Sequence, residues 1–282
     1  MNRHQHQVEQ FDADRVYKGR LFGNHFEEDP WVIFHGTSAS CSGDIETNGF
    51  QYPRNRLNAS QVQQVTDVFH AMRWDGNHTG GYAVLKTFSM SDFSGSASSP
   101  IFFTEKSTRA LRYAAIEHAG GEKLRAVRWA IADLRLYLRD EGAREEHATR
   151  MAEIFDYLVK KNAESAEIEF HRPPAVDLEW LDTQIGRLAD LDRVARQPVE
   201  DFAGGIVYAV RMEPCDVETM EYDFAMGIKA RSRVHPERIV GKMNIPVGYA
   251  HDDYAIKQDI DRLLRRLNSG VVAAIGQRAK PK

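Results

Sequence analysis

The sequence predicts an α+β protein whose strand-rich core is interrupted by a block of helices. Short apolar runs bounded by glycine or proline lie before residue 121 and again after residue 204, a pattern typical of buried strands. Residues 122–163 instead carry apolar side chains at helical spacing. Because strand-forming parts flank the helical block, we expect that block to be an insertion within one domain.

The first predicted strand follows a polar segment that ends at Pro30. Residues 31–34 (Trp-Val-Ile-Phe) are apolar and Gly36 follows them closely, which is typical of a buried strand. Ser60 precedes apolar residues at helical spacing, so we expect an amphipathic helix that ends near Asp75. The other elements expected before residue 121 are a strand over 82–88, a loop over 89–100, a strand over 101–104 and a helix capped by Ser107.

The second half is predicted to be helical first and to return to strands later. We expect two helices within 122–163 and a third over Leu178–Val194 that ends before Pro198, because proline interrupts a helix. The later expected elements are strands over 206–212, 228–234 and 239–245, and a helix over Asp253–Leu267. The predicted divisions are a polar extension (1–30), two parts of the core (31–120 and 204–250), a helical insertion (121–203), and a C-terminal helix and tail (251–282).

The composition excludes several classes of protein. The 282 residues are 42% hydrophobic, and the mean hydropathy is −0.50, as expected for a soluble globular chain rather than a disordered one. The 41 acidic and 37 basic residues give a net charge of −4. No overall positive field therefore holds the protein to nucleic acid or anionic lipid, and any contact with nucleic acid must be local.

The cysteines and the absence of long apolar runs indicate the compartment. Cys41 and Cys215 lie far apart in the sequence and define no disulfide, and no basic motif beside them indicates a nucleophile, so we assign them no role. The N-terminus lacks the apolar run of a secretion signal, and no stretch is long enough to span a bilayer. We expect a cytoplasmic protein without a membrane partner.

One segment at the end of the first strand carries the most chemical information. The sequence has no phosphate-binding loop with lysine, no GxGxxG after a strand, no HExxH and no CxxC pair. It does have His35, Gly36 and Thr37 at the end of an apolar run. Glycine permits close approach of a ligand to the backbone, and the two neighbouring side chains offer hydrogen-bonding groups. The alternative is a histidine bonded within the core beside a strand-ending turn.

Three blocks of the sequence resemble ADP-ribosyltransferases of the diphtheria toxin and poly(ADP-ribose) polymerase type. The first block is His35-Gly36-Thr37, followed by an isoleucine and a Gly-Phe pair. The second runs over residues 101–113, a strand, a serine-containing turn and a helix ending in tyrosine. The third comprises residues 204–210 and 231–245. The resemblance covers about a third of the chain and implies a split two-sheet core that binds NAD as co-substrate, with no metal.

The resemblance also implies roles for individual residues. His35 would bond the adenosine-side ribose of NAD, and the backbone of Gly36 would hold the nicotinamide carboxamide. Phe102, where the family has tyrosine, and Tyr113 would sandwich the nicotinamide ring. Thr37 and Ser107 are the further polar residues of the expected NAD site. A core position for Phe102 and a surface position for Tyr113 are the alternatives.

The expected catalytic glutamate is missing. The family places it on the strand before the closing turn, which corresponds to residues 227–229, where no carboxylate stands. Asp223 and Glu221 are the nearest upstream acids and become the candidate catalytic carboxylates, reaching the ribose through a bulge or a shifted register. The alternative is that both lie on a solvated loop. A carboxylate matters because cleavage of the nicotinamide–ribose bond creates an oxocarbenium-like centre.

The expected function is therefore transfer of ADP-ribose from NAD to a macromolecular acceptor, which is RNA, DNA or protein. A toxin held by an antitoxin protein, or a defence effector, is one form of this reading. Residues 51–98 and 121–200 are expected to recognise the acceptor, and basic and aromatic residues suited to this role are Arg54, Arg56, Arg73, Trp74, Lys86 and Phe88. The alternatives are a catalytically silent NAD-binding module, an RNA 2′-phosphotransferase and an NAD glycohydrolase.

Overall fold

The computed structural model describes residues 8–12, 21–51, 57–72, 80–88, 100–162, 176–223, 227–249 and 266–278. The chain divides into two compact units. Unit 1 contains residues 1–54, 97–121 and 198–282, and unit 2 contains residues 55–96 and 122–197. The chain therefore passes between the units four times.

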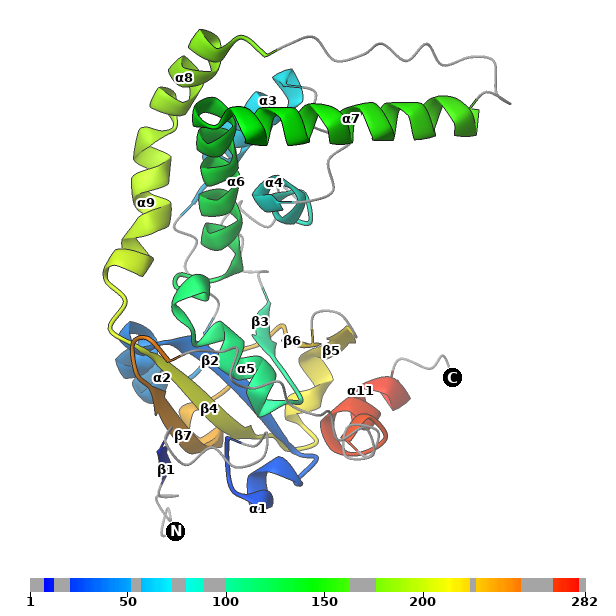
Figure 1. Cartoon of the computed structure of the whole chain (residues 1–282). Helices are drawn as coiled ribbons and strands as arrows, with labels where there is room; N and C mark the ends of the chain where they lie inside the picture. Colours follow the sequence, from blue (N-terminus) through cyan, green and yellow to red (C-terminus); the bar gives the residue numbers. More distant parts are fainter. Residues whose placement is uncertain are drawn as a thin grey trace, which may run out of the picture. The chain divides into compact units, whose positions relative to one another are not determined.

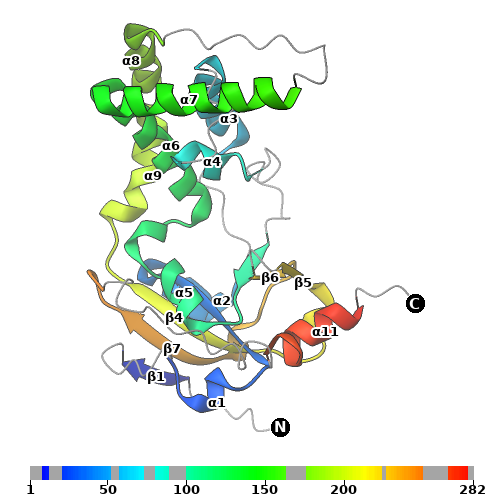
Figure 2. The same cartoon turned by 45° about the vertical axis from the view of Figure 1, so that its right-hand side comes forward.

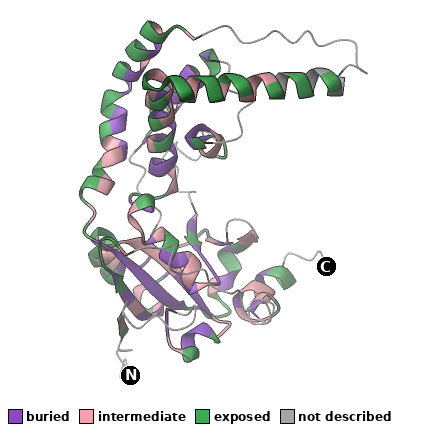
Figure 3. Ribbon diagram, in the orientation of Figure 1, coloured by how far each residue is buried: buried purple, intermediate pink, exposed green. Residues whose placement is uncertain are grey.

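A four-stranded sheet runs through unit 1 (Figure 1). Its strands, in spatial order, are β1 (Glu9–Asp12), β7 (Ile239–Ile245), β4 (Gly205–Arg211) and β2 (Val32–Ser38). β1 pairs with β7 in parallel, and the other neighbours are antiparallel. β4 is buried along all but its last residue, as the purple ribbon in Figure 3 shows, which explains why its sequence is continuously apolar.

A second, three-stranded sheet completes the strands of unit 1 in the described residues. Its spatial order is β3 (Ile101–Phe103), β6 (Gly227–Ala230) and β5 (Met220–Asp223), and both pairings are antiparallel. Side chains alternate between the faces of a strand. Phe103 and Ile228 accordingly belong to the core, whereas Phe102 and Lys229 lie on the opposite face and are not buried.

Apolar side chains cover both faces of the four-stranded sheet. On one face, Phe34 and Val207 pack against α5 (Ser107–Tyr113), which lies along β2 and β4 in both views (Figures 1 and 2). On the other face, Ile33 and Tyr208 share a hydrophobic cluster with the buried residues of the three-stranded sheet. The remaining described helices of unit 1 are α1 (Asn24–Glu27), α2 (Ser42–Asn48), α11 (Gly270–Arg278) and four short 3-10 turns (Ala39–Cys41, Ile116–His118, Asp216–Thr219 and Pro236–Arg238).

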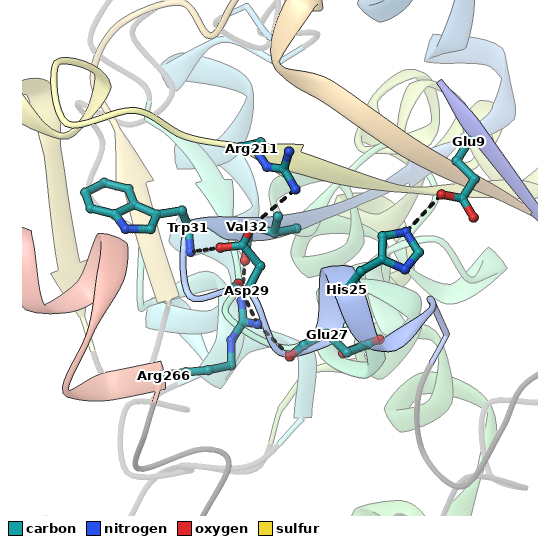
Figure 4. A network of polar contacts seen from close by, with 8 residues as sticks. All are labelled: Glu9, His25, Glu27, Asp29, Trp31, Val32, Arg211 and Arg266. Atoms are coloured by element: carbon teal, nitrogen blue, oxygen red, sulfur yellow. Dashed lines mark hydrogen bonds and ion pairs between the residues drawn. The ribbon is translucent and has the colours of Figure 1, made fainter. Parts of the chain in front are cut away.

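A buried arginine ties the C-terminal part of unit 1 to its N-terminal part (Figure 4). Arg266 donates to the backbone carbonyls of Glu27, Asp29 and Val32, in the turn between α1 and β2. The carboxylate of Asp29 in turn accepts from the amide of Trp31 at 2.9 Å and pairs with Arg211 at 3.2 Å. The turn that starts β2 is therefore held by charge-assisted hydrogen bonds.

Unit 2 is helical in its described residues. Its helices are α3 (Ala59–Ala71), α4 (Gly80–Leu85), α6 (Glu122–Arg139), α7 (Glu141–Asn162), α8 (Leu178–Arg187) and most of α9 (Ala189–Glu200). α6 supplies the apolar stripe expected from its spacing, since Leu124, Val127, Ile131 and Leu134 are buried. The ring of Tyr82 in α4 stacks on Phe69 of α3 at 4.2 Å between ring centroids.

The α+β class and the two helices within 122–163 are confirmed. The predicted strand over 82–88 is wrong, because Gly80–Leu85 forms α4, whose first amides bond the carboxylate of Asp133. The third helix is also wrong in extent, because it consists of α8 and α9, and Pro198 lies inside α9. A proline near the end of a helix is tolerated where few backbone bonds remain to be lost.

Several elements differ from the expected boundaries. β1 and α1 lie within residues 1–30, where only a polar extension is expected, and β5 was not predicted. The helical unit has an additional segment, residues 55–96, beside the expected insertion. Gly270 begins α11, a helix that was not predicted. Most of the helix expected over Asp253–Leu267 lies outside the described residues.

Candidate functional site

The edge strands of the two sheets meet at a single bridge. Phe34 of β2 and Thr104, which follows β3, exchange two backbone hydrogen bonds, both of 2.8 Å. In an antiparallel register, Gly36 and Phe102 would form the next pair of this kind. The ladder stops before that pair, and the two strands continue in different sheets. The bridge therefore marks where β2 and β3 separate.

Gly36 directs its backbone groups to the side on which β3 leaves. Phe34 uses both its N–H and its C=O toward Thr104, whereas the amide of Ala39 and the carbonyl of Trp31 bond residues of the β4 side. Backbone groups alternate in direction along a strand, so Gly36 shares the direction of Phe34. Its N–H and C=O are thus placed to bind a planar group that carries both a donor and an acceptor.

Close packing of α5 explains why position 36 is glycine. A Cβ at Gly36 would overlap the carbonyl oxygen of Ala110, and one at Gly205 on β4 would overlap that of Ala114. The backbone of α5 therefore lies directly on β2 and β4. The amide nitrogen of Ala114 would be 3.0 Å from the Cβ at Gly36, which places the neighbouring Tyr113 beside this part of β2.

His35 is a neutral hydrogen-bonding ring. Its Nδ1 lies 2.8 Å from the carbonyl oxygen of Phe102. A carbonyl only accepts, so Nδ1 carries the proton and Nε2 is the acceptor nitrogen. Desolvation between Phe50 and Phe103, whose ring centroids lie 4.9 and 5.4 Å away, lowers the pKa of His35 to about 4, although the bond to Phe102 opposes the shift. The ring is therefore uncharged at neutral pH.

The two predicted aromatic residues are both available at the surface. The side chain of Phe102 points away from the core and 39% of the residue is exposed. Tyr113, the last residue of α5, is partly exposed and meets His118 edge-to-face at 5.1 Å between ring centroids. The exposed ring of Phe102 is therefore available to stack on a planar ligand.

Ser107 and Thr37 differ in exposure. Ser107 is buried, and its hydroxyl donates to Oε1 of Glu27, which also accepts the amides of Leu21 and Phe22 at 3.1 and 3.2 Å. This arrangement commits the serine side chain to a buried carboxylate. Thr37 is partly exposed and lies on the same face of β2 as His35.

The candidate carboxylates lie on β5, the neighbour of β6. Glu221 stands opposite Lys229 and Asp223 stands opposite Gly227, in a regular antiparallel register without a bulge. Glu221 binds Arg231 through both carboxylate oxygens at 2.7 and 3.0 Å, and this hydrogen bonding is the main cause of its lowered pKa. Asp223 pairs with Lys229 at 3.0 Å. Both acids therefore belong to a strand rather than to a solvated loop.

A polar row on the four-stranded sheet was not predicted. His35, Tyr208 and Lys242 are register partners on β2, β4 and β7. Above them, Glu46 of α2 accepts from the hydroxyl of Tyr208 at 3.1 Å and pairs with Lys242 at 2.8 Å. Desolvation and the charge of Glu46 raise the pKa of Tyr208. Glu46 lies between Thr37 and the Gly-Phe pair of the first block, and its place there was the sequence signal that could have indicated this row.

The residues expected to recognise an acceptor are only partly described. Lys86 lies 5.5 Å above the ring of Tyr82, and Phe88 packs against the core of unit 2. Arg54, Arg56, Arg73 and Trp74 lie outside the described residues. On α6, the guanidinium of Arg125 lies 3.7 Å from the ring centre of the exposed Trp129, but Arg125 itself is buried and pairs with Glu122 at 2.8 Å.

No protein-family model, curated protein or solved structure matches this chain. Within the described stretches, no three His, Cys, Asp or Glu side chains gather as a metal site would require. Cys41 and Cys215 are free and exposed. In the same part of the chain, no helix combines the length and the apolar character needed to cross a bilayer.

Proposed function

We propose that unit 1 binds NAD and transfers ADP-ribose to a macromolecule, as the resemblance to ADP-ribosyltransferases implies. The observation that carries the proposal is the arrangement where β2 and β3 separate. Gly36 presents backbone N–H and C=O groups, His35 is a neutral hydrogen-bonding ring, and Phe102 exposes an aromatic face. Two small sheets that meet at one bridge also fit the split core expected for this family.

The nicotinamide half of NAD complements these groups. Its carboxamide carries a donor and an acceptor, which match the C=O and N–H of Gly36. Its ring is planar and cationic, so the faces of Phe102 and Tyr113 would attract it through stacking and cation–π interactions. The unprotonated Nε2 of His35 can accept a hydrogen bond from a ribose hydroxyl.

The reaction breaks the bond between C1′ of the ribose and the nicotinamide nitrogen. The bonding electron pair leaves with nicotinamide, which becomes neutral, and positive charge develops at C1′. A lone pair of the acceptor then bonds to C1′, and the acceptor loses its proton to a base or to water. The neutral state of His35 matters for this step, because a protonated imidazole would repel the developing cation.

The acceptor is RNA, DNA or a protein. Because the protein has a net charge of −4, binding of a nucleic acid would require a local basic surface. Unit 2 lies entirely outside the three blocks of the resemblance, so we assign acceptor recognition to it. A cytoplasmic toxin or defence role, with an antitoxin protein as partner, belongs to the same proposal.

A silent NAD-binding module is the second candidate. It is favoured by the absence of a carboxylate from β6, where the family has its glutamate. An NAD glycohydrolase, in which water replaces the macromolecule as acceptor, is the third. These functions differ in what happens to NAD, so one set of assays separates them.

The test uses the full chain with NAD labelled in the adenine half. Transfer predicts release of nicotinamide and label on protein or nucleic acid from a cell lysate, identified by mass spectrometry. Free ADP-ribose alone indicates a glycohydrolase. Binding of NAD by calorimetry without nicotinamide release indicates the silent module, and absence of binding contradicts all three.

Site variants make the test specific. Loss of one stacking ring costs about 1–3 kcal/mol, so Phe102→Ala and Tyr113→Ala should each weaken NAD binding by about 5-fold to 100-fold. Phe102→Tyr should retain binding because it keeps the ring. Tyr157→Ala, at a 62% exposed tyrosine of α7, is the matched control and should leave NAD binding unchanged.

A further inference from the structure

The two aromatic residues of the candidate site are each in contact with a histidine. Nδ1 of His35 lies 2.8 Å from the carbonyl oxygen of Phe102, and this bond fixes the backbone that carries the phenylalanine ring. The ring of His118 meets the ring of Tyr113 edge-to-face, with 5.1 Å between the centroids and 73° between the planes. The proposed function assigns a role to His35 but none to His118.

Tyr113 lies where its helix supports it least. It is the last residue of α5, and it is partly exposed. A helical side chain packs over the turn on its N-terminal side, and the last residue has no following turn beside it. Ala114 ends the helix, and the backbone is extended at Ala115. The orientation of the Tyr113 ring therefore depends on what the residues after the helix place next to it.

The residues after α5 form a closed turn, the 3-10 turn Ile116–His118. The amide of His118 donates to the carbonyl of Ala115 at 3.1 Å, and the amide of Gly121 donates to the carbonyl of His118 at 2.8 Å. Gly121 has a φ of 88°, a left-handed conformation that glycine adopts without strain. Backbone hydrogen bonds therefore hold His118 on both sides.

The start of this turn packs against the four-stranded sheet. A Cβ at Gly205 of β4 would overlap the carbonyl oxygen of Ala114, so the backbone touches the strand there. Ala114 is buried, and so is His118, which is only 5% exposed. A closely packed ring on a hydrogen-bonded turn has few alternative positions. His118 is therefore a fixed support beside the partly exposed tyrosine.

The geometry of the contact suits such a support. Aromatic rings attract one another in an edge-to-face arrangement when their centroids are about 4.5–7 Å apart. In this arrangement the edge of one ring meets the face of the other. The contact with His118 therefore uses at most one face of the tyrosine ring, and it does not use the other face, on which a planar ligand would stack.

We propose that His118 is the positioning residue for Tyr113 and thereby sets the affinity of the site for NAD. This inference rests on the proposed function, because His118 acts through the stacking of Tyr113 on nicotinamide. The contact orders the tyrosine ring on folding, so that less conformational entropy is lost when NAD binds. Each aromatic residue of the site is then oriented by a histidine, Phe102 through its backbone and Tyr113 through its ring.

A double-mutant cycle on the full chain tests this role, with the Kd for NAD measured by calorimetry. His118→Leu removes the ring and should weaken NAD binding about fivefold. In the Tyr113→Ala background the same change should alter the Kd by less than about twofold, because the ring that His118 orients is absent. His118→Phe keeps an aromatic ring and should restore most of the affinity.

His70 provides the matched control. It also meets a tyrosine edge-to-face, Tyr82, at 6.4 Å between ring centroids, but it belongs to unit 2. His70→Leu should therefore leave NAD binding unchanged. Thermal unfolding shows whether each variant is folded, and His118→Gln replaces His118→Leu if the apolar change prevents folding. In the wild type, nuclear Overhauser contacts between the Tyr113 and His118 rings should persist when NAD binds, and their absence overturns the inference whatever the variants show.

The outcomes separate this inference from the proposed function. A wild type that does not bind NAD contradicts both. Unchanged binding by Tyr113→Ala removes the tyrosine from the site, and the role of His118 with it. If Tyr113→Ala weakens binding but His118→Leu does not, only the role of His118 is wrong. Equal effects of His118→Leu in both backgrounds also overturn it, because they show a loss that does not act through Tyr113.

Discussion

Nδ1 of His35 lies 2.8 Å from the carbonyl oxygen of Phe102, so a side chain on the edge of one sheet bonds the backbone on the edge of the other. The bond replaces the ladder contact that β2 and β3 would otherwise make beyond Phe34 and Thr104. It fixes the tautomer of the ring and the carbonyl direction of Phe102 together.

Acid should destabilise unit 1 through His35. Its pKa falls from 6.5 to about 4 on folding, so between these pH values the unfolded chain binds the proton more readily. The contribution to stability is complete above pH 6.5 and is lost as the pH falls to 4. This contribution has an upper limit of about 3 kcal/mol. The actual value is smaller, because solvent screens a ring that is only partly buried. Urea unfolding of wild type and His35→Gln at pH 7 and 4.5 measures it.

The control for this prediction is a second partly buried histidine. His147 of α7 also has its pKa lowered to about 4, mainly by desolvation, and it belongs to unit 2. His147→Gln should reduce the acid sensitivity of a separate transition without affecting that of unit 1. NMR titration of His35 with a midpoint near 6.5 would contradict the prediction.

A methyl group at position 36 should be far more costly than one at position 43. The added Cβ of Gly36→Ala overlaps backbone of α5, which cannot move cheaply, so we expect a loss of several kcal/mol, on the order of the 1–3 or more seen for overpacked cores. Gly43 lies exposed in α2 with open space around it. Gly43→Ala should stabilise by roughly 0.5–1 kcal/mol. Thermal unfolding of both variants checks the contrast.

Ser107→Ala should affect stability more than NAD binding. The change removes a donor from the buried carboxylate of Glu27, at a cost of about 1–3 kcal/mol. Thr108→Ala, at the next and partly exposed residue, should cost much less. Calorimetric titration with NAD completes the comparison. A large loss of NAD affinity in a stable Ser107→Ala variant would restore the serine to the binding site.

Arg266→Ala should release the C-terminal part of unit 1. The variant leaves the carbonyls of Glu27, Asp29 and Val32 without a buried charged donor, with an expected loss of about 3–5 kcal/mol. Arg266→Lys keeps the charge but not the planar guanidinium, so its stability should lie between those of the wild type and Arg266→Ala. Limited proteolysis should cut near α11 faster in Arg266→Ala. Equal cleavage rates in wild type and variant would contradict the role.

The sequence predicted those parts of the fold whose local pattern agrees with their environment. β4 is apolar because it is buried on both faces, and α6 shows its inward stripe, so both were found. Residues 82–85 are apolar at consecutive positions like a strand, yet they lie in α4, whose first amides bond the distant Asp133 and whose Tyr82 stacks on Phe69. Such a long-range cap leaves no local signal.

Sequence motifs identified the residues of the candidate site, including Asp223 and Glu221, but not the strand pairing that positions these two acids. His35, Gly36 and Phe102 follow from short motifs, and the structure brings them together at one strand separation. The pairing of β5 with β6 could not be foreseen, because β5 is a short strand in which the two acids alternate with Met220 and Tyr222. That strand pairing decides which cation each acid meets, Lys229 for Asp223 and Arg231 for Glu221.

The double insertion of unit 2 has a consequence for how the protein folds. β2 and β4 are hydrogen-bonded neighbours, yet both segments of unit 2 lie between them in the chain. The entropy cost of closing such a loop grows only with the logarithm of its length, about 0.6 kcal/mol per doubling, so the insertion costs little at equilibrium. The rate is more sensitive, because distant contacts slow folding. Prior condensation of unit 2 shortens that search, and variants that weaken its helical core should therefore slow the assembly of the sheets of unit 1.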